Sequence, residues 1–331
     1  MSSSDIELEW PLVSPISCIA FSKESNLLAV GSFDGLICIY NFNESLQTFQ
    51  IYHKFGHSSN VLSLVFDGKS GLFSGDFSGV IKHTTLVHDM ETQVFGNHEQ
   101  GVSFLTISSQ RNLLISAGYD QIIKIYDLVC GRVIKELKAG GKVFAMDSND
   151  DWLAVGNSHH DLYVFNLEDL NEHAIIKREL TKYQLRSLKI LNDKETIVAA
   201  TIEGRVCVEA IDITENHKSK RYAFKCHRKK IEGIEQVYPV NAVAAHPTEA
   251  VFATGGSDRS LTLWDPKRRK RLVQLPNLQN SVQALEYNYN GTFIAIGMSF
   301  LNELEDAPLN SENSYVIVKK VDEIVIAPSK Q

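Results

Sequence analysis

The chain has 331 residues, of which 44% are hydrophobic and 22% are charged, and its formal net charge is -7. This composition is typical of a folded globular protein and excludes a disordered chain. A chain of this length can bury a sizeable core without disulfides or metals. Its acidic balance argues against a protein that coats nucleic acid, because such proteins usually carry a basic excess.

The five cysteines are odd in number, widely spaced and form no CxxC pair, so we expect neither a zinc site nor a redox dithiol. Cys18, Cys38 and Cys207 lie in apolar runs, where a free thiol behaves as a small hydrophobic group. This favours a reducing compartment, the cytosol or the nucleus. The first residues lack the regions of a secretory signal, and no apolar run reaches the length of a membrane span.

The first predicted element is an alternating strand at residues 6–10, where Ile6, Leu8 and Trp10 are separated by acidic residues. From residue 16 onward one pattern recurs: a short strand, an apolar run, a small residue, a polar turn, and an alternating strand that ends in an aromatic residue. In chain order the copies begin at Leu27, Leu72, Leu113, Leu153, Ile197, Phe252 and, in degraded form, Phe293. Alternation with a period of two indicates strands throughout.

The spacing of the small residue identifies the repeat. In chain order this residue is Gly31, Gly75, Ala117, Gly156, Ala200, Gly255 and Gly297, with steps of 44, 42, 39, 44, 55 and 42 residues. WD repeats have a similar period and four strands per blade. Tyr40-Asn41, Tyr126-Asp127 and Trp264-Asp265 resemble the WD dipeptide, with Phe165-Asn166 as a weaker copy.

The sequence therefore predicts an all-β fold, a seven-bladed WD-repeat β-propeller, as a single domain over residues 1–331. We expect the strand at residues 6–10 to become the outer strand of the last blade and so to close the ring. The alternative is a frayed N-terminal segment.

Three aromatic residues occupy one slot of the repeat. Phe33, Phe77 and Tyr119 each precede the polar turn residue between the second and third strands of blades 1 to 3. In WD-repeat propellers these turns share one rim with the connections between blades, which we call the upper rim. We predict that the three rings line a site for a bound peptide, since large rings anchor interfaces efficiently. The alternative is that they pack against neighbouring blades.

Six basic residues are assigned to the fifth blade, and we predict that they form an island of positive potential. They are Arg186, Arg205, Lys220, Arg221, Lys225 and Arg228. In the predicted outer strand, Arg221, Ala223 and Lys225 share one face, while Tyr222 and Phe224 share the other. Such a cluster suits an acidic or phosphorylated peptide, whose phosphate accepts charge-assisted hydrogen bonds. The alternative is ordinary solvated surface charge.

Two further charged segments have less definite interpretations. A basic run at residues 266–271 follows Trp264-Asp265, at a predicted turn on the lower rim. It fits either a nuclear import signal or nucleic-acid patch, or an exposed turn. An acidic stretch at residues 303–306 lies in a long upper-rim turn of the last blade, where it could meet a basic partner.

No sequence motif points to catalysis. The chain lacks a GxxxxGK[ST] phosphate loop, an HExxH motif and a GxSxG elbow. His159-His160 lies in a predicted tight turn without a third ligand at metal spacing. We therefore expect no enzyme activity, no catalytic residue, no metal and no cofactor.

Residues 201–206 and 221–228 closely resemble a signature shared by two related families of propeller. One is the Bub-three family of spindle-assembly checkpoint propellers, and the other is the family implicated in messenger-RNA export. Residues 234–242, 252–258 and 264–266 are similar to the checkpoint family. The likeness covers the whole chain in architecture.

This resemblance implies a non-enzymatic checkpoint adaptor. Similar proteins bind a short segment of a Bub-family checkpoint kinase and of its Mad-type relative across the upper face. They also recognise phosphorylated MELT motifs of the kinetochore scaffold, and this recognition recruits the kinases to kinetochores. The phosphothreonine is held by basic residues that match Arg205 and either Lys220 or Arg221 here.

The same resemblance implies a monomeric propeller in hetero-complexes, located in the nucleus, at kinetochores in mitosis, and partly in the cytoplasm. Membrane and nucleic-acid partners are not expected. The chain departs from the family at Phe33 and Tyr119, where tryptophan is common. The alternative is a messenger-RNA export propeller that binds a nucleoporin segment.

Overall fold

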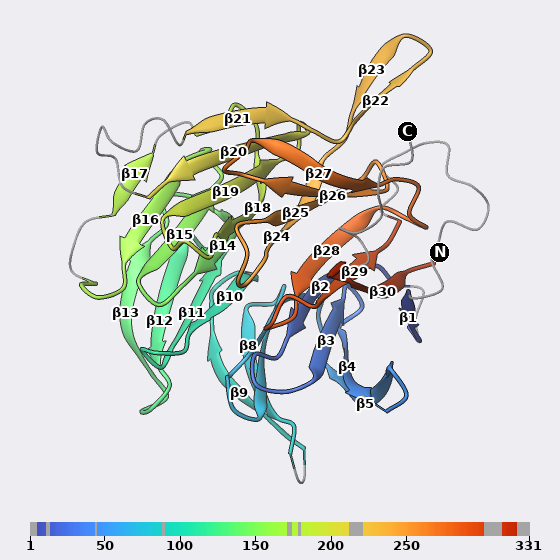
Figure 1. Ribbon diagram of the computed structural model, residues 1–331. Helices are drawn as coiled ribbons and strands as arrows, with labels where there is room; N and C mark the ends of the chain where they lie inside the picture. The colour runs from blue at the N-terminus through green and yellow to red at the C-terminus, as the bar shows by residue number, and fades with distance from the viewer. Residues whose placement is uncertain are drawn as a thin grey trace.

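The computed structural model describes residues 5–10, 14–43, 45–87, 90–170, 174–177, 180–211, 221–300 and 313–322. These residues form seven four-stranded antiparallel sheets and one two-stranded hairpin (Figure 1). The inner strands of successive sheets contact one another in order, and the last contacts the first, so the sheets are the blades of a closed ring. The predicted seven-bladed propeller is confirmed. No helix among these residues is long and apolar enough to span a membrane.

Each blade runs outward from the central axis. The inner strands are β2 (Ile16–Phe21), β6 (Val61–Phe66), β10 (Val102–Ser108), β14 (Val143–Ser148), β18 (Leu185–Ile190), β24 (Val240–Ala245) and β28 (Val282–Tyr287). The second strands are β3 (Leu27–Ser32), β7 (Gly71–Asp76), β11 (Leu113–Gly118), β15 (Trp152–Asn157), β19 (Thr196–Thr201), β25 (Phe252–Gly256) and β29 (Phe293–Met298).

The two outer strands complete each blade. The third strands are β4 (Leu36–Asn43), β8 (Val80–Thr85), β12 (Ile122–Asp127), β16 (Leu162–Asn166), β20 (Arg205–Ala210), β26 (Ser260–Asp265) and β30 (Tyr315–Lys320). The outermost strands of blades 1 to 6 are β5 (Thr48–Gly56), β9 (Glu91–Asn97), β13 (Arg132–Lys138), β17 (Ile175–Lys177), β21 (Tyr222–Lys225) and β27 (Lys270–Leu275).

Blade 7 takes its outermost strand from the other end of the chain. Strand β1 (Ile6–Leu8) pairs antiparallel with β30, and Leu8 lies opposite Val316. Leu8 is buried in the cluster between blades 7 and 1, and Trp10 packs against the same cluster. The predicted closure by the N-terminal strand is therefore confirmed.

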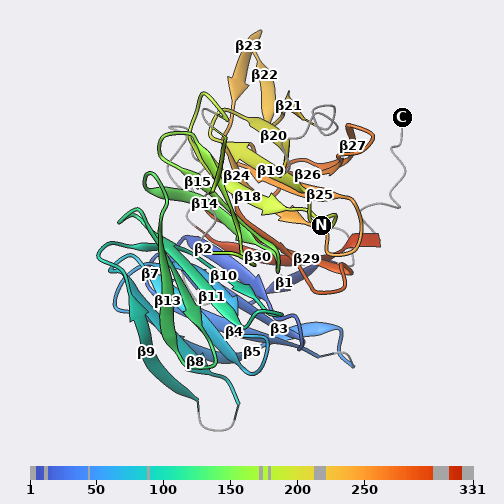
Figure 2. The same ribbon diagram turned by 90° about the vertical axis from the view of Figure 1, so that its left-hand side faces the viewer.

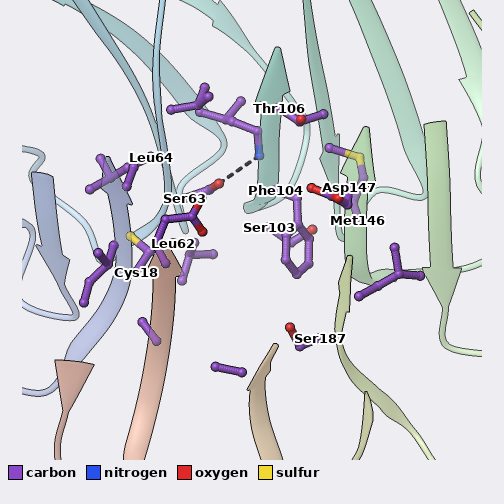
Figure 3. A pocket seen from close by; sticks show the side chains of 18 of the residues that line it. Cys18, Leu62, Ser63, Leu64, Ser103, Phe104, Thr106, Met146, Asp147 and Ser187 are labelled. Atoms are coloured by element: carbon purple, nitrogen blue, oxygen red, sulfur yellow. Dashed lines mark hydrogen bonds between the residues drawn. The ribbon is translucent and has the colours of Figure 1, made fainter. Parts of the chain in front are cut away.

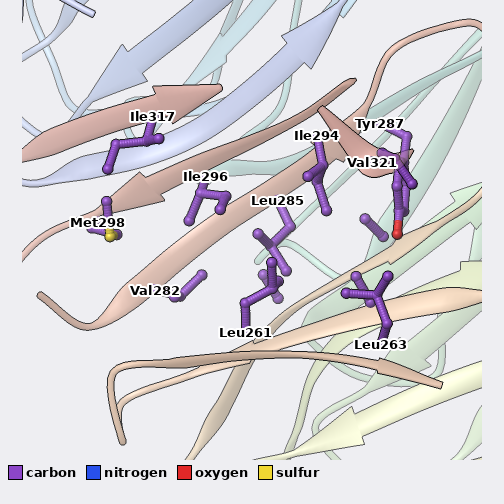
Figure 4. Packing of buried hydrophobic residues seen from close by; sticks show 13 residues of the cluster. Leu261, Leu263, Val282, Leu285, Tyr287, Ile294, Ile296, Met298, Ile317 and Val321 are labelled. Atoms are coloured by element: carbon purple, nitrogen blue, oxygen red, sulfur yellow. The ribbon is translucent and has the colours of Figure 1, made fainter. Parts of the chain in front are cut away.

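The hydrophobic core is divided into layers between blades. The described residues contain seven buried clusters, and each is built from two neighbouring blades. Figure 4 shows the layer between blades 6 and 7, where Leu261 and Leu263 face Val282, Leu285 and Ile296. Because apolar burial is the main driving force for folding, each blade is stabilised chiefly by the blades on either side of it.

The small residue of the repeat is required by this packing. In every blade it lies opposite the third residue of the inner strand, as Gly75 lies opposite Ser63. A Cβ atom at Gly75 would lie 2.7 Å from Cγ1 of Val102, the first residue of the next inner strand. Gly31 and Gly156 face Val61 and Leu185 in the same way. The repeat period is thus the spacing between successive contacts of one blade with the next.

Buried histidines tie three of the upper-rim turns to the blades. Nδ1 of His57 is 2.8 Å from Asp76, and its Nε2 is 2.7 Å from the Ser74 hydroxyl. His98 and His227 make equivalent pairs with Asp120 and Asp258. Burial lowers the pKa of His57 and of His98, so these rings are neutral at physiological pH.

The contact at Gly75 can be tested by substitution. We expect Gly75→Ala to lower the free energy of unfolding by about 1–3 kcal/mol, because the added methyl group overpacks the interface between blades 2 and 3. In a Val102→Ala background the same change should cost much less, because the clashing methyl groups are gone. Urea denaturation of the four proteins measures this coupling. Equal costs in both backgrounds would contradict the proposed packing.

Candidate functional site

A cavity of about 450 Å³ lies along the axis of the ring and is lined by the inner strands of all seven blades. Figure 3 shows Ser63, Phe104 and Asp147 around it, each from a different inner strand. The Ser63 hydroxyl accepts a hydrogen bond of 2.8 Å from the backbone N–H of Leu105, which ties blade 2 to blade 3. The cavity therefore belongs to a rigid part of the fold.

A β-bulge at the upper end of every inner strand determines which side chains surround the cavity mouth. In all seven blades the register shifts between the first and third residues of the inner strand. A bulge re-aims the extra residue, and here all the extra residues line the cavity. They are Ser17, Leu62, Ser103, Phe144, Arg186, Asn241 and Gln283. Arg186 is the one charged member of this ring, so the mouth of the cavity is positive.

Arg186, the second residue of the inner strand of blade 5, therefore lies at the mouth of the cavity. It acts electrostatically on Tyr119, whose pKa is raised by burial and lowered in part by the Arg186 charge. No ion pair to Arg186 is found among the residues that the structure describes. Its guanidinium is thus available to an acidic ligand at the upper face.

Deeper in the cavity, three charged side chains join blades 4, 5 and 7. Nζ of Lys189 lies 3.4 Å from Asp147 and 3.5 Å from Glu286. Although burial opposes its charge, the two carboxylates raise the pKa of Lys189 above its ordinary value. Burial raises the pKa of Glu286. This cluster is internally paired, so it contributes to the structure of the ring and offers little free charge to a ligand.

The three predicted aromatic residues lie on the upper rim. Phe33 and Phe77 are exposed, with 37% and 56% of their surface accessible, whereas Tyr119 is half-buried. The Tyr119 ring stands between Phe77, at 6.3 Å, and Phe144, at 6.2 Å between ring centroids. Phe77 and Tyr119 thus pack on each other, and the three residues present apolar surface at the upper rim. A bound peptide on this surface remains a prediction.

One apolar residue of this surface was missed from the sequence. Ile202 occupies the same slot in blade 5, and its backbone N–H bonds the Gln184 carbonyl as that of Tyr119 bonds Gly101. It is 38% exposed. Alignment of the turn residue in all seven copies would have revealed it, because blades 4, 6 and 7 carry serine there.

Two cations of the predicted cluster face each other on blade 5. Arg205 of β20 is the register partner of Lys225 of β21, so their side chains lie on one face at the upper end of the blade. Arg205 Nε donates to Glu203 at 3.0 Å. Lys225 is exposed and has no ion pair among the described residues. Like charges directly opposite in a sheet are destabilising, and here the Glu203 carboxylate balances part of the Arg205 charge.

Arg221 lies at the opposite end of the same strand. It is four residues from Lys225, about 13 Å along a strand. Arg221 Nε lies 2.7 Å from the carboxylate of Glu209, which is buried and also lies 3.3 Å from Nζ of the buried Lys177 in blade 4. Arg221 is thus directed toward Glu209 and not toward Arg205. Which of the predicted basic residues share a phosphate stays a prediction.

Arg228 has a different environment. Its side chain is mostly buried, donates to the Glu203 carbonyl at 2.9 Å and pairs with Glu235 at 2.9 Å. It stands at the base of the hairpin of β22 (Arg228–Ile231) and β23 (Ile234–Val237), which projects from the ring in both views (Figures 1 and 2). This hairpin lies within the 55-residue step of the repeat and was not predicted. Lys220 and the acidic stretch at 303–306 lie outside the described residues.

The alternation predicted for the outer strand is confirmed. Arg221, Ala223 and Lys225 are exposed, whereas Tyr222 and Phe224 are half-buried against blade 6. The Phe224 ring lies 4.6 Å from that of Trp264, between centroids. One face of β21 therefore anchors the blade, and the other presents its cations to solvent.

Four of the five cysteines, all except the exposed Cys130, are unsuited to chemistry. Burial raises the pKa of Cys18 and Cys226 to about 12, and that of Cys38 and Cys207 to about 11. Thiols of this kind are inert at neutral pH. Nδ1 of His159 lies 2.7 Å from the Gly140 carbonyl. Among the described residues, no three metal-ligating side chains meet.

The fold defines a WD-repeat β-propeller. The WD domain, G-beta repeat model matches residues 12–41, 90–127 and 221–265. Solved structures of U3-55K and of the RRP9 WD40 repeats share the fold, with TM-scores of 0.81 and 0.79 over 96% of the chain at 18% identity. The structural matches cover 99% of the U3-55K chain and 98% of the RRP9 chain.

Sequence comparison identifies the family within the WD-repeat propellers. Mitotic checkpoint protein bub3 of Dictyostelium discoideum is 32% identical, and the match covers 91% of each chain. Mitotic checkpoint protein bub-3 of Caenorhabditis elegans is 30% identical over 96% of this chain and 94% of its own. The poly(A)+ RNA export protein of Schizosaccharomyces pombe is 27% identical over 89% of this chain and 84% of its own. The chain belongs to the mitotic checkpoint bub3 family of WD-repeat propellers, as its sequence signature predicts.

The buried carboxylate of Glu209 gives a stability prediction. Glu209→Ala should lower the free energy of unfolding by about 3 kcal/mol, because it leaves the buried Lys177 ammonium without a partner. Replacing both residues, as in Lys177→Met with Glu209→Leu, should restore most of this loss, since no buried charge remains. Urea denaturation tests both variants. If the double variant is as unstable as the single one, the loss does not arise from an unpaired lysine.

Proposed function

We propose that this chain is a non-enzymatic adaptor of the spindle-assembly checkpoint. It binds a short segment of a Bub-family checkpoint kinase and of its Mad-type relative, recognises phosphorylated MELT motifs of the kinetochore scaffold, and so recruits the kinases to kinetochores. Membership of the mitotic checkpoint family supports this proposal. We further propose that the protein is located in the nucleus, at kinetochores in mitosis, and partly in the cytoplasm, and that it is a monomer within hetero-complexes.

The kinase segment lies across the upper face. Phe33, Phe77 and Tyr119 offer apolar surface that a partner can cover, and Arg186 offers a cation at the centre of that face. Buried aromatic contacts provide most of the energy of such interfaces. An acidic side chain of the partner placed over the cavity mouth pairs with Arg186 and determines the register of the segment.

The phosphothreonine lies at the upper end of blade 5. The observation that carries this assignment is the cross-strand pair of Arg205 and Lys225, two cations held opposite each other. A phosphate dianion between them converts an unfavourable pair into two charge-assisted hydrogen bonds. Arg221 is already paired with Glu209, so we assign it to another part of the peptide.

Binding of a MELT peptide, with and without phosphate, tests this assignment. Arg205→Glu should weaken binding of the phosphorylated form by about 1.5–3 kcal/mol, the value of one charged hydrogen bond. Lys225→Glu should weaken it similarly and also raise the free energy of unfolding slightly, because it removes the like-charge pair. Fluorescence anisotropy and urea denaturation measure the two effects.

The matched control is Lys138→Glu, which makes the same charge change on an exposed residue of blade 3. It should leave peptide binding unchanged. Equal affinity of the native protein for both forms of the peptide would refute recognition of the phosphate.

Likeness to the fission-yeast poly(A)+ RNA export protein favours a second candidate. In this alternative the upper face binds a nucleoporin segment and the protein contacts RNA, with a steep dependence of affinity on salt. A gel shift with single-stranded RNA at physiological salt tests it. Absence of a shift counts against this alternative.

A further inference from the structure

The lower rim carries a concentrated positive patch that the proposed checkpoint function does not use. Five consecutive basic residues, at 267–271, lie in the turn between strands β26 and β27 of blade 6 and in the first two residues of β27, and all five are exposed. They stand out in a chain whose net charge is -7. We call these residues the basic turn.

The basic turn is held in one conformation. Asp265 accepts hydrogen bonds from the backbone N–H of Arg268, at 2.8 Å, and from its guanidinium, at 3.1 Å. Arg269 adopts a left-handed conformation with φ of 53°, where the corresponding turn of blade 3 has Gly131 with φ of 66°. A residue other than glycine is strained there. Arg269 therefore adopts this conformation at a conformational cost.

Contacts with blade 5 fix the same turn from the other side. The guanidinium carbon of Arg269 lies 4.6 Å from the centroid of the Tyr222 ring. The Tyr222 hydroxyl donates a 2.9 Å hydrogen bond to the Pro266 carbonyl. A cation over an aromatic face is attracted to it, so the strained residue is anchored to the neighbouring blade. The charges are thus preorganised before any partner arrives.

This geometry argues against an import signal read as an extended chain. Lys270 and Arg271 are the first residues of β27, where they pair in register with Asp265 and Trp264. A receptor that binds an extended basic segment would have to detach β27 from its blade. The basic turn is instead suited to a partner that contacts a folded surface.

Most of the charge is not compensated locally. Asp265 pairs with Arg268, and Arg271 bonds the neutral Gln274. Lys267 and Lys270 have no ion pair within the part of the chain that the structure describes. Several cations fixed at one turn therefore attract an anionic ligand, and the attraction weakens with salt.

The chemistry of the surface favours an acidic protein segment over a nucleic acid. Proteins that bind single strands use exposed aromatic rings on which bases stack. Here the Tyr222 ring is covered by Arg269, and Phe224 packs against Trp264. The surface therefore offers charge without a stacking platform.

We propose that the basic turn is a docking site for an acidic protein segment, rich in aspartate and glutamate, on the rim opposite the upper face. This site does not depend on the proposed checkpoint function. Because it lies on the other rim, it can be occupied at the same time as the upper-face site.

The probe is a fluorescein-labelled peptide of alternating glutamate and serine, compared with an oligouridylate of equal charge by fluorescence anisotropy. Native protein should bind the peptide more tightly than the oligouridylate, with an affinity that falls as salt rises. Neutralising four residues of the turn, Lys267→Gln, Arg268→Gln, Lys270→Gln and Arg271→Gln, should weaken peptide binding about tenfold or more. Arg269 is left in place so that the turn keeps its anchor.

The matched control neutralises four exposed cations elsewhere: Lys69→Gln, Arg132→Gln, Lys138→Gln and Lys142→Gln. This control has the same net charge as the variant of the basic turn, and it should bind the peptide as tightly as the native protein does. Equal losses in both variants would show a general charge effect and overturn the proposal. Tighter binding of the oligouridylate, or no peptide binding at low salt, would also overturn it. Thermal melting of both variants confirms that they are folded.

Discussion

Everything in this molecule depends on the contact between one blade and the next. A single four-stranded sheet of this size has no core of its own, and the buried residues belong to layers shared by two blades. The small residue of each second strand allows the first residue of the next inner strand to approach closely, as at Gly31 and Val61. The ring is stable because seven such contacts close on themselves, with no exposed sheet edge left at the seam.

The same packing produces the binding surface. Each inner strand has a β-bulge beside the close contact between blades, and the bulge turns one side chain toward the cavity mouth. The ring of bulged residues varies in character, from Ser17 to Phe144 to Arg186, because the close contact at the small residue is made mainly by the residues beside them. Asn241 is an exception, since its Nδ2 donates a hydrogen bond of 2.9 Å to the Val282 carbonyl of the next blade. Turn residues at the upper rim vary for the same reason. The scaffold and the recognition surface are thus separate sets of residues that alternate along the chain.

The fold could be predicted from the sequence because its determinants are local and repeated. The spacing of Gly31, Gly75 and their equivalents reports the packing between blades directly, and the alternation of residues 221–225 reports the two faces of β21. The six basic residues were harder to place. Their assignment to blade 5 followed from the repeat, but Arg186 faces the axis because of a bulge, and Arg221 lies beside Glu209 because of strand direction. Neither the bulge nor the strand direction can be recognised from the residues of a single repeat.

The hairpin of β22 and β23 and the buried histidines were also missed. The hairpin has exposed apolar residues, such as Ile234, and so it lacks the alternation of buried and exposed residues that indicates a blade strand. The histidines act through partners 19 to 31 residues away, as His57 does with Asp76 and His227 does with Asp258. Tertiary contacts of this kind are not visible in local periodicity.

Strand β1 imposes an order of events on synthesis. Its partner β30 follows about 300 residues later, so at 5–20 residues per second the ribosome needs about 15–60 s to deliver it. Until then blade 7 lacks a strand, and the layer between blades 7 and 1 is open to water. A nascent chain must therefore keep Leu8 and its neighbours soluble, or shielded by a chaperone, through most of translation.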